Sequence, residues 1–177
     1  MFRRRLRETL SESANTEPED GPKRYRMVEK MLAFGDDFFI ENGRGQRVFK
    51  VDGKAVRLRD TLVFRDMQGQ EVCKIQERVA RIRDTMVIEG PRGEHLATVQ
   101  KAVISPIRDR FIVKIGEGPD LHIRGNILAH EYQIGDVATV SKKWFRVRDS
   151  YGVEIADGQN DLIILAATVC IDQMTHD

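Results

Sequence analysis

The chain has 177 residues, enough for one domain with a substantial core, and its 29 Lys and Arg against 28 Asp and Glu give a formal net charge of +1. This balance excludes a global field that draws in nucleic acid, so no nucleic-acid partner is expected and any charged partner must meet a local patch. Cys73 and Cys170 lack CxxC or CxxH spacing, which favours reduced thiols over a disulfide framework or a zinc site.

Residues 1–22 are predicted to form a disordered charged tail, because an arginine-rich block and an acidic block carry too few apolar side chains to fold. Phe2, Leu6 and Leu10 have helical spacing, so a short basic helix lying on a membrane surface is the alternative. The rest of the chain, 23–177, is expected to form the single domain.

No stretch reaches the roughly 18 apolar residues of a membrane-spanning helix, so no transmembrane segment is expected. The N-terminal residues also lack the apolar region of a signal peptide. Both observations predict a cytoplasmic location, with peripheral membrane association as an option.

A repeat follows the tail. Residues 55–75 align without gaps with residues 79–99 at an offset of 24, and six aligned positions are identical, among them Gly69 and Gly93. Gly45 lies one period before Gly69. Short apolar runs broken by turn residues at this spacing predict a repeated β-hairpin.

Further hairpins are predicted along the chain from apolar runs flanking turn signals. Their paired segments are 38–40 with 46–51, 110–115 with 121–123, 127–134 with 137–140, and 144–148 with 153–155. Together with the repeat they amount to about twelve strands.

Residues 161–174 have almost no polar face, and an element that is apolar all round is buried on all sides. Its length, Ala166 and Ala167, and Asn160 or Asp161 as N-cap favour a helix, although the β-branched residues leave a strand as the alternative. A barrel of twelve strands is too wide for its own side chains to fill. The expected fold is therefore mainly β: a closed antiparallel barrel of about twelve strands around a central, C-terminal hydrophobic α-helix.

Several segments in order resemble the LURP-one-related proteins, which belong with the Tubby C-terminal domain and the phospholipid scramblases. The segments are 31–40 (MLAFGDDFFI), 51–55 (VDGKA), 58–61 (LRDT), 141–145 (SKKWF) and the stretch from Asp149 to Asp172. This resemblance covers residues 25–174 and implies a twelve-stranded barrel that encloses a C-terminal hydrophobic helix. Among these relatives, Tubby domains bind membrane phosphoinositides, scramblases are associated with calcium and phospholipid, and plant members are linked to defence.

The strongest basic cluster consists of Lys142, Lys143, Arg146 and Arg148 around Trp144. In an alternating strand, Arg146 and Arg148 share a face with Trp144, and such a cationic strip can contact anionic phospholipid headgroups. The alternative is an ordinary charged barrel exterior.

A second set of basic residues alternates along the predicted strands of the repeat and beyond it. This set comprises Arg57, Arg59, Arg81, Arg83, Arg108 and Arg110. Aspartates at positions 60, 84 and 109 can neutralise these arginines, which favours a structural role.

The acidic residues before the final helix do not form an EF-hand loop, because counting from Asp149 places Tyr151 and Val153 at ligand positions. A turn and a helix cap are favoured instead. His130 and Glu131 are adjacent, and on a strand they point to opposite faces. No catalytic, metal or cofactor site is expected, although a catalytic site assembled only in space stays open.

The predicted function is a non-enzymatic barrel that binds anionic phospholipid headgroups or membrane surfaces through the basic cluster. A protein-interaction scaffold without lipid affinity is the alternative. A small-molecule binder with a surface cleft is a third option.

Overall fold

The computed structural model describes residues 22–28, 37–52, 61–80, 83–105, 108–145 and 148–176. Its strands are β1 (Lys23–Val28), β2 (Phe38–Asn42), β3 (Arg47–Asp52), β4 (Thr61–Arg65), β5 (Glu71–Ala80), β6 (Arg83–Glu89), β7 (His95–Ser105), β8 (Arg108–Ile115), β9 (Leu121–Asn126), β10 (Glu131–Ile134), β11 (Ala138–Ser141) and β12 (Ser150–Ile155). A short 3₁₀ helix, η1 (Lys142–Trp144), follows β11, and the helix α2 (Asp161–His176) follows β12.

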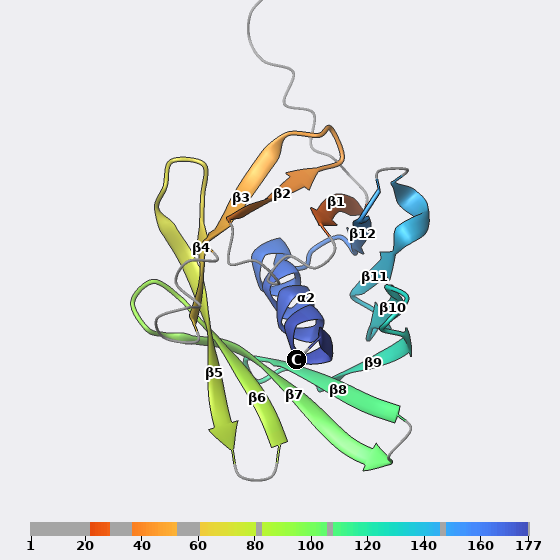
Figure 1. Ribbon diagram of the computed structural model, residues 1–177. Helices are drawn as coiled ribbons and strands as arrows, with labels where there is room; N and C mark the ends of the chain where they lie inside the picture. Colours follow the sequence, from red (N-terminus) through yellow and green to blue (C-terminus); the bar gives the residue numbers. More distant parts are fainter. Residues whose placement is uncertain are drawn as a thin grey trace, which may run out of the picture.

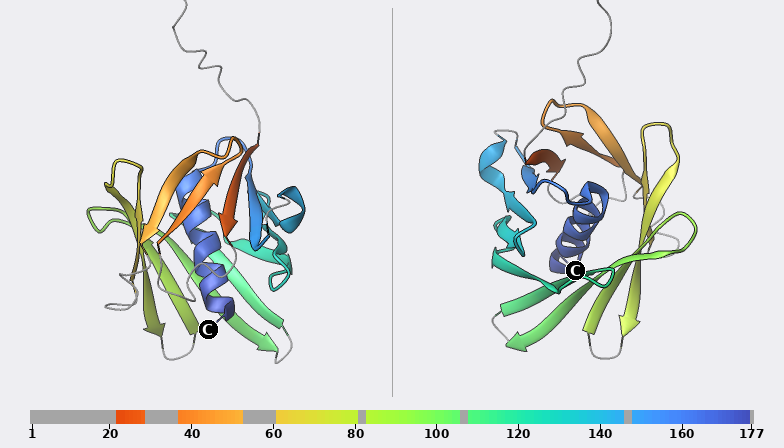
Figure 2. Two further views of the ribbon diagram at one scale, coloured as in Figure 1. Left: turned by 45° about the horizontal axis from the view of Figure 1, so that its top comes forward. Right: turned by 180° about the vertical axis from the view of Figure 1, so that it is seen from behind.

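In the described part of the chain, twelve antiparallel strands close into a barrel, because β1 pairs with both β2 and β12. Every other pair joins strands that are consecutive in sequence, so the wall is an up-and-down meander. The wall surrounds α2 (Figure 1), and the views from other sides show the same enclosure (Figure 2). The predicted fold class is confirmed.

The interior position of α2 follows from its composition. Ten consecutive residues, 163–172, are buried, and Leu165 has no exposed surface. Their apolar side chains pack against the inward-facing residues of the strands in one core cluster, which includes Phe64 and Phe111. The helix therefore fills a space that the wall alone leaves open.

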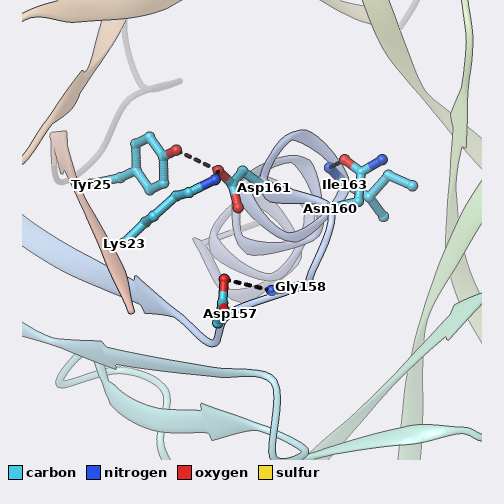
Figure 3. A network of polar contacts seen from close by, with 7 residues as sticks. All are labelled: Lys23, Tyr25, Asp157, Gly158, Asn160, Asp161 and Ile163. Atoms are coloured by element: carbon cyan, nitrogen blue, oxygen red, sulfur yellow. Dashed lines mark hydrogen bonds and ion pairs between the residues drawn. The ribbon is translucent and has the colours of Figure 1, made fainter. Parts of the chain in front are cut away.

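The start of α2 is fastened to the first strand (Figure 3). Asn160 is the N-cap, because its side-chain oxygen accepts a hydrogen bond from the backbone N–H of Ile163 at 3.2 Å. The carboxylate of Asp161 accepts hydrogen bonds from the Tyr25 hydroxyl at 2.6 Å and from the Lys23 ammonium at 3.0 Å. Two side chains of β1 thus fix the start of the helix to the wall of the barrel.

The sequence repeat is a structural repeat. The hairpins β4–β5 and β6–β7 turn through Gly69 and Gly93, whose φ angles of 83° and 82° favour glycine. In each turn, the glycine N–H donates to the carbonyl of the residue three positions earlier. Gly45 makes the same bond in the β2–β3 turn with a φ of 75°. The predicted hairpin unit is confirmed, and three hairpins share its geometry.

Alternating strand direction places the connections on two rims of the barrel. We call the rim where α2 begins the N-terminal rim, and it carries the connections after β2, β4, β6, β8 and β10. The opposite one is the C-terminal rim, where β1, β9 and β11 end. His130, in the β9–β10 connection, contacts Asp172 near the end of α2, which places the end of the helix at this rim.

The last predicted hairpin is wrong. In the described part of 144–148, no strand pairs with 153–155, because Trp144 ends η1 and residues 148–149 form a turn. Strand β12 instead pairs with β11 and β1. The predicted strand 127–134 is also too long, since 127–130 form a turn and β10 begins at Glu131.

Some predictions fall outside the described residues. These are the tail up to residue 21, with its proposed surface helix, and most of the arginine set of the repeat. Among the residues that are described, no helix is long and apolar enough to cross a membrane.

Candidate functional site

The basic cluster begins where β11 ends, and Glu131 of the neighbouring strand organises it. The Ser141 hydroxyl lies 3.0 Å from both carboxylate oxygens of Glu131 and donates its hydrogen bond there, while the backbone N–H of Lys142 donates to the same carboxylate at 3.2 Å. The Ser141 hydroxyl oxygen also accepts a bond from the N–H of Lys143 at 3.1 Å. These bonds close the first turn of η1 and replace the strand that alternation predicted.

Trp144 packs against the outer face of β12 at Gly152. A Cβ atom on Gly152 would lie 2.8 Å from Cε3 of Trp144 and 2.8 Å from Cε2 of Phe145, so both rings rest on the glycine backbone. The guanidinium of Arg24 lies 5.1 Å from the centre of a Trp144 ring, and its Nε donates to Glu154 at 2.6 Å. Trp144 is therefore a fixed part of the surface.

The structure brings together most of the predicted site residues, but in a different arrangement. Lys142, Lys143 and Trp144 share the single turn of η1, and Arg148 lies exposed in the turn before β12. The fifth residue, Arg146, lies outside the described residues. The strand that would have given Trp144 and Arg148 a common face is not formed in the described residues, because Trp144 ends the 3₁₀ helix and Arg148 lies in the turn before β12.

We call Lys142, Lys143 and Arg148 the basic turn. The side chain of Lys143 is 81% exposed, and its Nζ lies 3.8 Å from a Glu131 oxygen, a distance at which an exposed pair contributes little. Asp149 follows Arg148 directly and is exposed. Three basic and two acidic side chains therefore leave an excess of one positive charge in these five residues.

Several residues that shape this surface escaped sequence reasoning. Arg24 is 120 positions from Trp144, and Gly152 and Glu131 contact η1 from separate strands. No local pattern could identify Arg24, since only the closure of the barrel brings β1 beside β12. Glu131 and Gly152 lie on the two strands that flank β11, and their contacts depend on the strand register.

A second polar group that the sequence did not reveal lies inside the C-terminal rim. His130 Nε2 and Asp172 Oδ1 are 2.8 Å apart, and the two side chains are only 2% and 7% exposed. The ring of Tyr151 stacks on His130 with 4.3 Å between ring centres. Burial, and then the charge of Asp172, raise the pKa of the Tyr132 hydroxyl above its ordinary value.

His130 adopts a left-handed backbone with a φ of 49° and turns its ring into the interior, while Glu131 bonds to the surface turn. The two adjacent side chains face opposite ways, although His130 lies in the turn and not on the strand that the prediction assumed. A group with so little solvent access does not meet a dissolved substrate. Its role is to tie the end of α2 to the β9–β10 connection.

A small pocket of about 180 Å³ opens at the N-terminal rim. Gln133, Asp136, Thr139 and Glu154 are among its lining residues, and Arg24 already engages the carboxylate of Glu154. Ligand pockets commonly measure roughly 300–1,000 Å³, so this pocket gives the small-molecule option little support. Within the described ranges, no group of three or more His, Cys, Asp or Glu is placed to hold a metal ion.

Comparison with known proteins shows the family of the chain. Residues 23–172 match the LURP-one-related family. The uncharacterized protein YxjI of Bacillus subtilis (strain 168) is 28% identical over 154 residues, which cover 85% of this chain and 92% of the relative. An Arabidopsis thaliana protein solved by X-ray crystallography has the same fold, with a TM-score of 0.60 and 21% identity over 87% of this chain and 91% of its own. The chain belongs to the LURP-one-related family.

Proposed function

We propose that this protein binds the anionic surface of a membrane peripherally, through the basic turn and Arg146 in the same connection. The observation that carries the proposal is the way η1 is held. Glu131 fastens its start and Gly152 seats Trp144, so the lysines are presented on a preorganised turn. The sequence resembles the LURP-one-related proteins, which belong with the Tubby domains, and the binding of membrane phosphoinositides by Tubby domains supports an anionic lipid as the class of ligand.

The contribution of each cation is modest. A lysine or arginine near an anionic membrane surface adds about 1 kcal/mol, and this attraction decays over a Debye length of about 8 Å at physiological ionic strength. The basic turn alone therefore supports reversible binding that weakens with salt.

The test is co-sedimentation with vesicles of phosphatidylcholine that contain phosphatidylserine. We expect the native protein to bind these vesicles and to stay in solution with phosphatidylcholine alone. The double variant Lys142→Glu, Lys143→Glu should bind at least about tenfold more weakly, because two attractive charges become repulsive. Added salt should weaken native binding in the same direction.

The matched control makes the same change in net charge at the opposite rim. Arg92 lies exposed in the β6–β7 turn and Lys114 lies near the end of β8, both at the N-terminal rim. The variant Arg92→Glu, Lys114→Glu should bind like the native protein. Equal losses in both double variants would overturn the assignment to the basic turn. Failure of the native protein to bind would overturn lipid binding and leave the protein-interaction scaffold as the function to test.

A further inference from the structure

Two large apolar side chains lie exposed at the same rim as the basic turn. Leu128, in the turn between β9 and β10, is 71% exposed, and Val28, the last residue of β1, is 43% exposed. In the described residues a third, Met67, is 45% exposed in the β4–β5 turn at the N-terminal rim. The C-terminal rim therefore combines cations with exposed apolar groups.

The strand register shows how close these groups are. One row of paired residues crosses the wall from β9 to β1 and runs Asn126, Glu131, Ser141, Gly152, Arg26. On the C-terminal side of this row, β9 continues into the turn that carries Leu128, and β11 continues into η1. On β1, Val28 lies two residues past Arg26 in the same direction. Neighbouring strands are about 4.8 Å apart, so the row spans about 20 Å. The five strands lie side by side in the wall (Figure 1).

The local charge supports only weak, reversible electrostatic binding. The basic turn and its two neighbouring carboxylates have an excess of one positive charge, which Arg146 in the same connection raises to two, and Glu154 and Glu41 pair with Arg24 and Arg26. Stable attachment of a protein to a bilayer surface generally needs two contributions, one apolar and one electrostatic. A single exposed leucine is ordinary on a protein surface, but here it stands beside the cations that would complement it.

We infer that the C-terminal rim docks on an anionic bilayer with Leu128 inserted among the lipid headgroups and Val28 as a second apolar contact. The inference rests on the proposed function and adds an orientation to it. The end of α2 faces the membrane and the N-terminal rim, with Met67, faces water. Moving an apolar side chain out of water is favourable only where the partner offers an apolar interior. A bilayer offers such an interior and a dissolved phosphate does not.

The first test replaces the inserted side chain. Leu128→Ser should lower the affinity for vesicles of phosphatidylcholine and phosphatidylserine about tenfold, because the variant lacks the apolar surface that leucine buries in the bilayer. Met67→Ser is the matched control at the opposite rim and should bind like the native protein. Both side chains are exposed turn residues outside the core, so both variants should retain the native unfolding transition.

The second test reports where residue 128 lies. Cys73 and Cys170 have no exposed surface, so a cysteine at position 128 can be labelled selectively with an environment-sensitive fluorophore. We expect Leu128→Cys labelled in this way to shift to shorter wavelength on vesicle binding and to be quenched by nitroxide lipids. The same label on Met67→Cys should do neither.

The outcomes separate the two proposals. If native binding depends on Lys142 and Lys143 but Leu128→Ser binds normally and the label at 128 stays in water, the docking inference is wrong and the proposed function stands. If the native protein does not bind these vesicles, both are overturned. A label at position 67 that enters the bilayer would reverse the orientation and also overturn the inference.

Discussion

At the scale of single residues, the two thiols show how the interior controls reactivity. Cys73 on β5 and Cys170 on α2 are both fully buried. Burial, and then the charge of Glu71, raise the pKa of Cys73 from 9.0 to about 12. Burial raises the pKa of Cys170 as well, with Cys73 as the next cause. Because the thiolate is the reactive form, both thiols should be inert in the folded protein.

Thiol titration with an aromatic disulfide reagent at about pH 8 tests this prediction. The native protein should react far more slowly than the unfolded chain, in which both thiols should be modified. Rapid modification of either cysteine in the native state would contradict the buried positions of Cys73 and Cys170.

The same raised pKa predicts how stability changes with pH. In the unfolded chain the thiol titrates near 9.0, and in the folded protein Cys73 titrates near 12. The folded state therefore keeps its proton where the unfolded state loses it, so this contribution is fully present below pH 9.0 and is lost as the pH rises from there toward 12. Urea unfolding across this range should show a falling free energy of unfolding, and Cys73→Ala should make the decline shallower.

At the scale of elements, η1 depends on the absence of a side chain in β12. Gly152 does not have a positive φ, so its backbone conformation does not require glycine. Glycine is needed there because Trp144 and Phe145 approach its backbone closely. The contact with Gly152 positions η1 against β12. The hydrogen bond from the Ser141 hydroxyl to the Glu131 carboxylate attaches its other end to β10.

Gly152→Ala should displace η1 from its seat. We expect a loss of about 1–3 kcal/mol in the free energy of unfolding, because the added methyl group overlaps two aromatic rings. The emission of Trp144, which is the one tryptophan in the chain, should shift to longer wavelength as its ring becomes more hydrated.

Gly43→Ala is the control for this change, because a Cβ there meets only ordinary contacts of 3.6 Å or more. It should alter neither stability nor emission to the same degree. If Gly152→Ala leaves both observables unchanged, the seating of η1 on β12 is wrong.

At the scale of the whole molecule, the barrel and its central helix depend on each other. The wall closes around α2, and the inward side chains of the strands find their apolar partners on the helix. Neither part has another surface on which to bury its apolar side chains. The domain should therefore unfold as one cooperative unit.

Leu165→Asp should abolish the folded state. A charge left without a partner in the interior costs several kcal/mol, against a total stability of roughly 5–15 kcal/mol for a domain. Gln173→Asp, on the partly exposed side of the same helix, should remain folded. Circular dichroism and urea titration distinguish the two. A soluble Leu165→Asp protein with a normal transition would show that α2 is not core.

Much of this architecture could be predicted, because its causes are local. The 24-residue repeat specified hairpins whose glycines take positive φ, and the apolar run before Met174 specified a buried helix. The failures fell where a contact with a neighbouring strand overrode the local pattern. Alternation predicted a strand through Trp144, but Glu131 and Gly152 hold that segment in a 3₁₀ turn.

The sequence by itself thus determined the closed antiparallel barrel, the hairpins of the repeat and the central helix, since turn chemistry and apolar periodicity act over a few residues. Only the tertiary structure decided which groups share a rim. Barrel closure brings Arg24 to Trp144, the packing of α2 inside the wall pairs His130 with Asp172, and the register of β9, β10 and β11 places the Leu128 turn at the same rim as the basic turn. These juxtapositions depend on strand register and on the direction of the chain around the barrel, which no short segment encodes.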